Sequence, residues 1–234
     1  SGTCEVEEAG VEGVLGSVPL FAALDADSAA TLEKMLTTRN VGRGHVVFSE
    51  GDDGDRLFIV LEGKVKITRA SADGRENLIA VLGAAEMFGE LSLFDPGPRT
   101  ASVSAITDST LASLDHDDLR PLLLERPGVA VELLQALAQR LRRTNEAMAD
   151  LVFTDVPGRV AKALLDLADK FGVVEADGIR VRHDLTQEEL AQLVGASRET
   201  VNKALSEFAH RGWLRIEGRS VLLLDPERLT RRAK

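Results

Sequence analysis

The spacing of apolar residues changes along the chain and divides it into three stretches. Residues 14–36 carry apolar positions at helical spacing, including Leu24, Leu32 and Leu36. From residue 43 to about residue 113, short apolar runs alternate with turn-forming residues at intervals of about 8–12 residues. The runs are Val46–Phe48, Leu57–Leu61, Val65–Ile67, Leu78–Leu82, Val103–Ile106 and Leu111–Leu114. This pattern predicts an antiparallel barrel or jelly roll.

From Pro127 onward the apolar spacing is that of a coiled-coil seam, alternating between three and four residues. The seam positions are Leu134, Leu137, Leu141, Thr144, Met148 and Leu151. Because the chain has no second helix of this kind, we expect the stripe to pair with a second copy in a parallel homodimer. The alternative is that the stripe packs only on the chain's own barrel.

A joint between two helices is predicted at residues 153–155. Asp155 is suited to cap a following helix, and Pro157 is suited to its first turn. That helix is expected to continue through Leu164 and Phe171 and to stop at Gly172. We place the domain boundary at this joint.

Residues 186–210 carry the pattern of a helix-turn-helix. Thr186 and Glu189 form a capping box, Gly195 supplies the turn, and Ser197 caps a second helix from Arg198 to about His210. The second helix is expected to enter the major groove of DNA, where its exposed residues would contact base edges. The expected DNA-binding residues are Thr186, Gln187, Ser197, Arg198, Glu199, Asn202, Lys203 and Arg219. Taken alone, the pattern also fits an ordinary helix with a solvated surface.

A hairpin follows, with apolar alternation on both sides of Glu217-Gly218-Arg219, and it is typical of the wing of a winged helix. Arg215 and Arg219 can contact phosphate there, or can be plain surface charge. The predicted fold class is α+β. An N-terminal β-roll or jelly-roll domain (residues 14–126) precedes a long dimerisation helix (residues 127–153) and a winged helix-turn-helix domain (residues 154–234).

The net charge of −10 is high for a DNA-binding protein, but it is unevenly distributed. Residues 155–234 carry 14 Lys and Arg against 13 Asp and Glu, whereas residues 1–154 carry 14 against 25. The predicted DNA-binding domain is therefore close to neutral. Local charge near the phosphates matters more for binding than the total, so DNA binding stays compatible with this composition.

The remaining composition argues against metal, disulfide and membrane roles. Cys4 is the single cysteine and the four histidines are far apart, so no metal or iron–sulfur site is expected. No apolar run of membrane-spanning length occurs, and the acidic N-terminus does not resemble a signal peptide. We expect a cytoplasmic protein.

A candidate anion site lies between Phe88 and Ala101. Gly89 permits close approach of the main chain, Glu90-Leu91-Ser92 can open a short helix, and Arg99 offers a planar fork to phosphate. The carboxylate of Glu90 needs a donor such as a ribose hydroxyl, so a sugar phosphate fits, although a surface Glu–Arg pair is the alternative. Thr144 and Asn145, polar residues on the seam, can set its register or hydrogen-bond a ligand reaching from the barrel.

From Leu15 to Leu229 the chain resembles the bacterial cAMP receptor protein (CRP/FNR) family, in particular its actinobacterial branch of GlxR- and Crp-type regulators. The stretches Phe88–Ala101, Arg140–Asn145, Thr154–Val160 and Leu185–Lys203 carry the resemblance. Its best-known member has serine where this chain has Asn145 and arginine where it has Lys203. Lysine lacks the bidentate fork of arginine.

The resemblance implies that Glu90 holds the ribose of cAMP, that Arg99 and Thr100 hold the cyclic phosphate, and that Thr144 and Asn145 face the adenine. The implied nucleotide-binding residues are Gly89, Glu90, Leu91, Arg99, Thr100, Ala101, Thr144 and Asn145. It also implies that Arg198, Glu199 and Lys203 read a TGTGA-like half-site.

We therefore expect a homodimeric transcription regulator, not an enzyme, whose DNA-binding domains are repositioned by cAMP. The expected partners are double-stranded DNA, cAMP, a second copy and RNA polymerase, with no metal and no membrane. One alternative keeps the fold but is ligand-independent or responds to another cyclic nucleotide. A second alternative is a regulatory domain of an enzyme, although no Walker A, HExxH or nucleophile-elbow motif occurs. A third is a pure interaction module.

Overall fold

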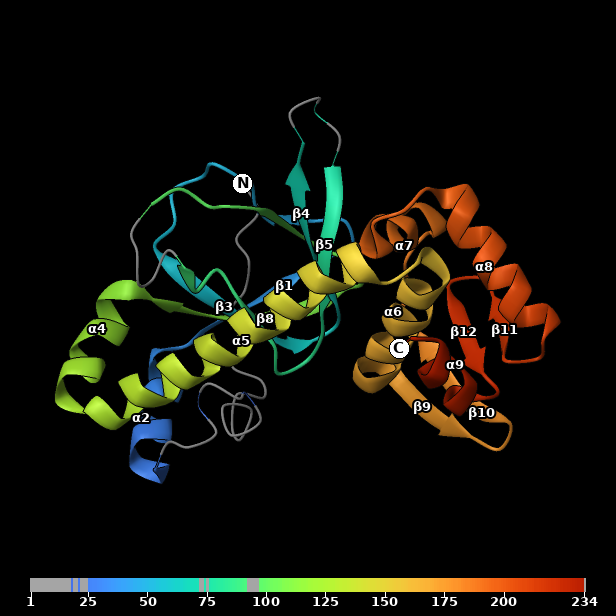
Figure 1. Cartoon of the computed structure of the whole chain (residues 1–234). Coiled ribbons are helices and arrows are strands. Elements are labelled where there is room, and N and C mark those ends of the chain that lie inside the picture. Colours follow the sequence, from blue (N-terminus) through green and yellow to red (C-terminus); the bar gives the residue numbers. More distant parts are fainter. Residues whose placement is uncertain are drawn as a thin grey trace. The chain divides into compact units, whose positions relative to one another are not determined.

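The computed structural model describes residues 18, 21, 25–71, 74, 76–91 and 97–233 of the chain. The fold divides into two compact units (Figure 1), residues 1–76 with 80–141, and residues 77–79 with 142–234. The division falls inside one long helix, α5 (Pro127–Phe153). In the part of the chain that the structure describes, no helix has the length and apolar character needed to cross a membrane.

Two four-stranded sheets, in the orders β1-β8-β3-β6 and β2-β7-β4-β5, account for most of the first unit, and their described pairings are antiparallel. This confirms the antiparallel β-roll expected from the alternating apolar runs. The strands are β1 (Thr37–Val41), β2 (Val46–Phe48), β3 (Arg56–Glu62), β4 (Val65–Ala70), β5 (Glu76–Leu82), β6 (Met87–Phe88), β7 (Ser102–Ala105) and β8 (Ser109–Asp115). Of these, β1 and β6 are not predicted by the sequence pattern.

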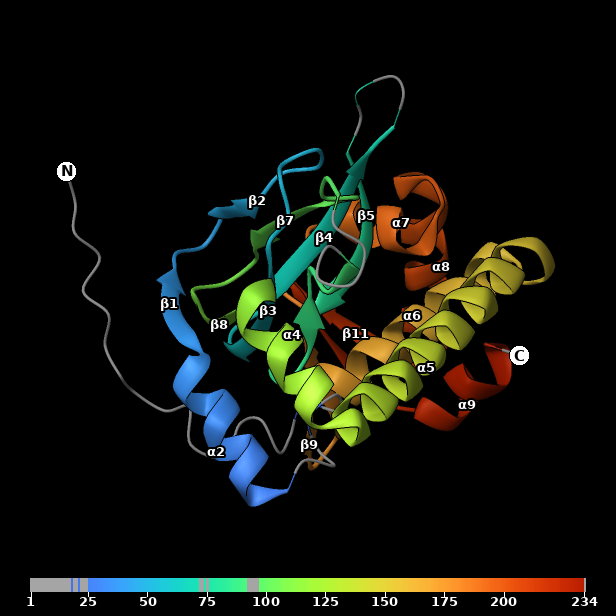
Figure 2. The same cartoon turned by 90° about the vertical axis from the view of Figure 1, so that its left-hand side faces the viewer.

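Strands β3 and β8 separate two hydrophobic cores, because their side chains alternate between the faces of the sheet. Phe58 and Leu111 point into the core between the two sheets. Leu57 and Leu114 point the other way, into a core shared with helices. Those helices are α2 (Ala26–Met35), α4 (His116–Glu125) and the first part of α5, and Figure 2 shows them beside the roll. Most of the residues predicted as helical before Asp25 lie outside the described part of the chain.

The apolar stripe of α5 is largely uncovered in the single chain. Leu134, Leu141 and Met148 are each exposed by more than 60%, and Phe153 is 85% exposed. Apolar side chains in a row at this exposure are costly in water and mark a contact surface. Within the first unit, Leu134 and Leu141 therefore stay largely exposed beside the roll.

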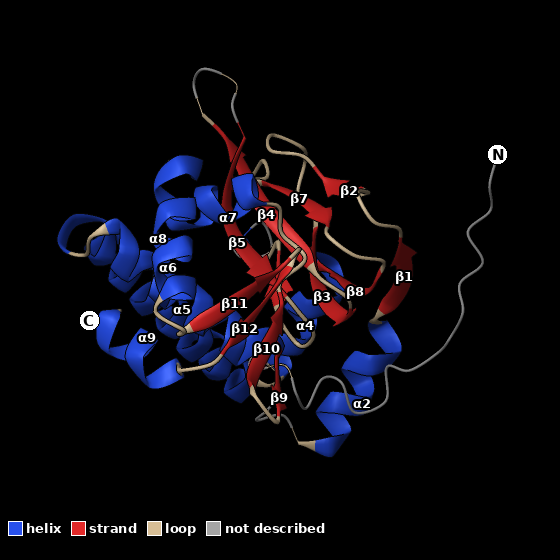
Figure 3. Ribbon diagram, turned by 90° about the vertical axis from the view of Figure 1, so that its right-hand side faces the viewer, coloured by secondary structure: helices blue, strands red, loops and turns tan. Residues whose placement is uncertain are grey.

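In the second unit, helices pack on a four-stranded antiparallel sheet of order β11-β12-β10-β9 (Figure 3). The strands are β9 (Gly172–Glu175), β10 (Gly178–Arg182), β11 (Leu214–Glu217) and β12 (Ser220–Leu223). The helices are α6 (Val156–Phe171), α7 (Gln187–Val194), α8 (Arg198–His210) and α9 (Pro226–Arg232). The wing is confirmed as the β11–β12 hairpin, but the sheet is larger than predicted because β12 also pairs with β10.

Candidate ligand site and DNA-binding surface

The residues expected to hold an anion meet at one place in the roll. Gly89 and Glu90 directly follow β6, and Arg99 precedes β7. Main-chain hydrogen bonds fix Arg99 to the loop after β2, since its amide donates to the carbonyl of Asp52 and its carbonyl accepts from Gly51. The side chains of Glu90 and Arg99 are almost fully buried, at 2% and 5% exposure. The alternative prediction, that Glu90 and Arg99 form an ordinary surface pair, is therefore wrong.

The guanidinium of Arg99 is anchored by two main-chain carbonyls and an aromatic ring. Its Nη1 donates to the carbonyl oxygen of Gly89 at 3.0 Å, and its Nη2 donates to that of Arg56 at 2.9 Å. Its Cζ lies 4.3 Å from the centroid of the Phe48 ring. Among the described residues, nothing accepts a hydrogen bond from its buried Nε. A buried N–H donor without an acceptor is costly and is suited to an incoming anion.

Burial is the main influence on the charge of Arg99 and lowers its pKa from the ordinary value. The carboxylates of Asp55, Asp52 and Glu90 act in the opposite direction, while the charge of Arg56 adds to the lowering. Arginine nevertheless stays protonated in proteins. The result is a fixed positive charge in a place where water screens it poorly.

Replacing Gly89 by alanine is expected to weaken anion binding without unfolding the roll. Gly89 has a φ of +76°, which disfavours alanine, and an added Cβ would lie 2.7 Å from Nη1 of Arg99. The guanidinium must then leave its carbonyl acceptor. We expect about tenfold weaker binding of a cyclic nucleotide, measured by calorimetry, together with a loss of about 1 kcal/mol in stability from the backbone strain. Unchanged affinity would show that Arg99 need not hold this position.

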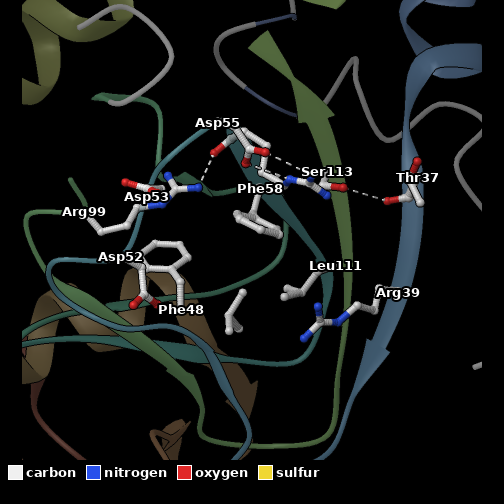
Figure 4. A pocket seen from close by; sticks show the side chains of 12 residues that line it. Thr37, Arg39, Phe48, Asp52, Asp53, Asp55, Phe58, Arg99, Leu111 and Ser113 are labelled. Carbon is white, nitrogen blue, oxygen red and sulfur yellow. Dashed lines mark hydrogen bonds and ion pairs between the residues drawn. The ribbon is translucent and has the colours of Figure 1, made fainter. Parts of the chain in front are cut away.

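A cavity of about 300 Å³ opens beside Arg99 (Figure 4). Its walls combine aromatic and aliphatic side chains with six charged groups. The lining residues are Thr37, Arg39, Val47, Phe48, Asp52, Asp53, Asp55, Arg56, Phe58, Arg99, Leu111 and Ser113. Glu90 and Gly89 do not line it, so Arg99 is shared between this cavity and the predicted phosphate site.

The other predicted ligand residues are less completely placed. Thr100 and Leu91 are exposed and Ala101 is half-buried, all beside the Glu90–Arg99 pair in sequence. Leu91 is helical, but the rest of the expected short helix lies outside the described residues. Thr144 and Asn145 are exposed on α5 within the second unit, so their role toward an adenine stays a prediction. In the described ranges no cluster of His, Cys, Asp or Glu could hold a metal ion.

The helix-turn-helix is formed by α7 and α8 and confirms the predicted caps. The Thr186 hydroxyl accepts from the Glu189 amide at 3.1 Å, and the Glu189 carboxylate accepts from the Thr186 amide at 2.8 Å. Gly195 ends α7 in the left-handed region at φ 72°, where glycine is favoured. Ser197 then caps α8 by accepting from the Thr200 amide. The buried face of α8 consists of Val201, Ala204, Leu205 and Phe208.

The predicted base-reading residues lie on the opposite side of α8, with one exception. Arg198, Glu199 and Lys203 are exposed, as are Thr186, Gln187 and Ser197 near the helix starts. Asn202 is only half-buried rather than exposed, and its Oδ1 is buried without a hydrogen-bond partner among the described residues. Its amide group is thus less available for base contact than the helical spacing predicts.

The wing presents Arg219 at its tip, after Gly218 with φ 63°. Arg219 is exposed, whereas Arg215 lies 3.8 Å from the Glu217 carboxylate. Arg180 on β10 braces this hairpin by pairing with Glu217 and, at 2.6 Å, with Glu175. These two carboxylates raise the pKa of Arg180 from its ordinary value. The geometry leaves Arg219 as the wing residue most available to a phosphate.

Sequence reasoning missed an arginine network at the α5–α6 joint. Asp155 caps α6 as predicted, accepting from the Gly158 amide at 3.0 Å, but it also receives a 2.6 Å bond from Arg232 on α9. Arg159 donates to the carbonyls of Thr154, Val194 and Gly195. Arg159 therefore ties the joint directly to the turn of the helix-turn-helix.

Replacing Asp155 by alanine is expected to destabilise the second unit by about 1 kcal/mol, since a helix cap is lost. Asp155→Asn keeps a good cap and removes the charge pairing, so its cost should be smaller. Unfolding can be followed by the fluorescence of Trp213, the chain's single tryptophan, which stacks on Phe208. Equal stability of Asp155→Ala and wild type would contradict a capping role.

The contribution of Asp155 to folding stability depends on pH in a direction that its pKa shift fixes. The Arg232 guanidinium, then the Gly158 amide, hold the pKa of Asp155 below its ordinary value. A carboxyl whose pKa is depressed by folding stabilises the fold above its unfolded pKa of about 3.9, and this contribution is lost as pH falls through the folded value. The difference between wild type and Asp155→Asn should therefore be constant at neutral pH and shrink in acid below about pH 4.

In the roll, sequence reasoning identified Arg99 but missed two groups that contact it. Phe48 and the carbonyl of Arg56 approach Arg99 from strands about 50 residues earlier in the chain. Phe48 belongs to the predicted apolar run Val46–Phe48, but no signal in that run indicates contact with a cation.

Comparisons with known proteins find a separate domain family for each of the two units. Residues 38–126 match the family model of the cyclic nucleotide-binding domain, and residues 158–232 match that of the Crp-like helix-turn-helix domain. The chain is 57% identical over 224 residues to the CRP-like cAMP-activated global transcriptional regulator of Mycobacterium tuberculosis, covering 96% of this chain and 100% of that one. It is 35% identical over 212 residues to the Cyclic AMP receptor protein of Thermus thermophilus, covering 88% and 95%.

Solved structures show the same architecture. The c-di-GMP responsive global regulator CLP of Xanthomonas campestris superposes with a TM-score of 0.73 at 28% identity, covering 85% of this chain and 99% of that one. The relatives and the two matched domains are regulators rather than enzymes. The chain therefore belongs to the CRP/FNR family of DNA-binding transcription regulators, in its actinobacterial branch.

Proposed function

We propose that this chain is a cAMP-responsive homodimer that binds palindromic TGTGA-like DNA sites. The observation that carries the ligand half of the proposal is the buried Arg99, whose Nε has no acceptor among the described residues and which lies near the buried carboxylate of Glu90. A cyclic phosphate would accept hydrogen bonds from the Arg99 guanidinium, and a ribose hydroxyl would donate one to the Glu90 carboxylate. The name of the Mycobacterium tuberculosis relative as cAMP-activated supports this ligand at 57% identity.

The dimer half of the proposal is supported by the exposed seam of α5. Leu134, Leu141 and Met148 recur at coiled-coil spacing and stay uncovered in one chain. A second copy would bury them. Thr144 and Asn145 on the same helix would then face the adenine, from one subunit or the other.

The regulatory step is a shift between two states of this dimer. Nucleotide contact with Thr144 and Asn145 would extend ordered coiled coil toward the joint at Phe153–Asp155. The two recognition helices would then lie about one DNA turn, roughly 34 Å, apart. The nucleotide acts only if it binds this state better than the other, with a typical coupling of about 1–3 kcal/mol.

The test is a titration of cAMP into purified protein while binding to one TGTGA-N6-TCACA duplex is followed by anisotropy. We expect the DNA affinity to rise by about 5- to 150-fold at saturating cAMP, and the protein to sediment as a dimer. DNA affinity that is the same with and without cAMP would contradict the proposal.

A second candidate is that another cyclic nucleotide is the effector. The Xanthomonas campestris regulator is described as c-di-GMP responsive and shares this architecture. Parallel titrations with cAMP, cGMP and c-di-GMP separate the candidates, and a response to c-di-GMP alone would favour the second. The expected interaction with RNA polymerase can be tested by a transcription assay on a template that carries the same duplex sequence.

A further inference from the structure

We propose that Phe48 is a positioning residue for nucleotide binding, because its ring holds the Arg99 guanidinium in the orientation that presents Nε to a phosphate. This inference rests on the proposed function, since it assumes that the roll binds a cyclic nucleotide. The first observation is the contact itself. The Cζ of Arg99 lies 4.3 Å from the Phe48 ring centroid and 5.9 Å from that of Phe58. Phe48 is thus the nearer of the two rings.

The contacts of Arg99 restrain its guanidinium in two directions. The carbonyls of Gly89 and Arg56 accept from the two terminal nitrogens, so they fix the group within its own plane. The Phe48 ring, whose centroid lies 4.3 Å from Cζ, limits movement of the guanidinium toward that side. These bonds use two of the five N–H donors of arginine, and the Nε–H, buried and without an acceptor in the described part of the chain, is one of the donors left for a ligand.

The Phe48 ring is itself braced by two more deeply buried rings. Its centroid lies 5.8 Å from that of Phe58 and 5.9 Å from that of Phe88, and those two rings stack at 5.2 Å. Phe88 is 1% exposed and Phe58 is 9% exposed, whereas Phe48 at the end of β2 is only half-buried. The cluster therefore provides a rigid support whose outermost ring contacts the cation.

The cavity beside Phe48 explains why such a support matters. Asp52, Asp53 and Asp55 line it together with Arg99, and Figure 4 shows their carboxylates around the guanidinium and ring. Asp55 and Asp52 attract the charge of Arg99. If the ring is removed, the guanidinium gains room to turn toward these carboxylates and away from a phosphate. An aliphatic residue at position 48 would fill space but would not attract the cation.

The experiment measures cAMP affinity by calorimetry for the full chain and four variants. Phe48→Leu and Phe48→Met remove the aromatic face, and methionine keeps most of the volume. Phe48→Tyr restores a ring. Val47→Ala is the matched control, because Val47 is the neighbouring β2 residue and lines the same cavity. Thermal unfolding of each variant identifies any that fail to fold, and the methionine variant decides the question if the leucine variant does not fold.

We expect about tenfold weaker cAMP binding for Phe48→Leu and Phe48→Met, and affinities within about threefold of wild type for Phe48→Tyr and Val47→Ala. In an Arg99→Gln background, Phe48→Met should change the affinity by less than about twofold, since the cation it supports is absent. An equal loss in both backgrounds would overturn the proposal, because Phe48 would then act on the ligand or on packing alone.

Failure of this inference is distinguishable from failure of the proposed function. If wild type binds cAMP and Phe48→Met binds it equally well, only the positioning role is wrong. If wild type binds no cAMP at millimolar concentration, both are wrong.

Discussion

Replacement of Arg99 by alanine should reduce cAMP affinity by about 100-fold or more. The cyclic phosphate would lose a charged donor that is 95% buried, and hydrogen bonds to charged groups are worth about 1.5–3 kcal/mol each. Two such bonds, one from Nε–H and one from a second N–H of the guanidinium that no carbonyl uses, amount to at least about 3 kcal/mol, which corresponds to more than a factor of 100. Calorimetry on the purified chain measures this directly. The loss should exceed that of Gly89→Ala, in which the arginine remains but is displaced.

The control for this prediction is Arg69→Ala. Arg69 is a surface arginine of the same unit, 63% exposed, and pairs with Glu50. Its removal changes the net charge equally but leaves the site intact, so affinity should stay within about twofold of wild type, as exposed pairs contribute little. Similar affinities for Arg99→Ala and wild type would exclude Arg99 as the phosphate contact. Equal losses in both variants would indicate a long-range charge effect instead.

The fold was predictable from sequence where a strand coincides with a short apolar run bounded by turn-forming residues. The runs at Val46–Phe48, Leu57–Leu61 and Leu111–Leu114 all lie in strands of the roll. Strand β1, with sequence TTRNV, carries a single buried residue, Val41, and therefore gives no apolar period. Strand β9, GVVE, is exposed along its length as an edge strand, so its valines gave no indication of a buried face.

The two functional sites differ in how local their determinants are. The caps of the helix-turn-helix join residues three apart, so Thr186, Glu189 and Ser197 could be read from the sequence. Glu90 and Arg99 were found through their residue types and the resemblance. The carbonyl of Arg56 and the ring of Phe48 could not be found, because strand pairing brings them to Arg99.

The same limit applies at the α5–α6 joint. Arg159 contacts the carbonyls of Val194 and Gly195, 35 and 36 residues later, and Arg232 contacts Asp155 across 77 residues. Long arginine side chains reach any carbonyl or carboxylate that tertiary packing brings near, so spacing cannot predict their partners. The sequence therefore shows which arginines can donate hydrogen bonds, but only the structure shows which carbonyls and carboxylates accept them.

Loss of sequence discrimination is the expected result of replacing Arg198 by alanine. Arg198 is exposed in the first turn of α8, where an arginine can bond both acceptors of a guanine. Each such contact is worth about 1–3 kcal/mol of discrimination, and the proposed dimer has two. The ratio of affinities for a TGTGA-N6-TCACA duplex and a scrambled duplex should therefore fall by at least about 30-fold at fixed salt.

Arg211→Ala is the matched control, since Arg211 lies just after the other end of α8, is 54% exposed and pairs with Glu207. It carries the same charge but lies at the opposite end of α8 from the predicted base-reading residues, so its variant should keep the discrimination ratio. If Arg198→Ala also keeps that ratio while both duplexes bind more weakly, Arg198 contacts phosphate rather than a base. The reading of the half-site would then have to come from Glu199 and Lys203, the other exposed residues at that end of the helix.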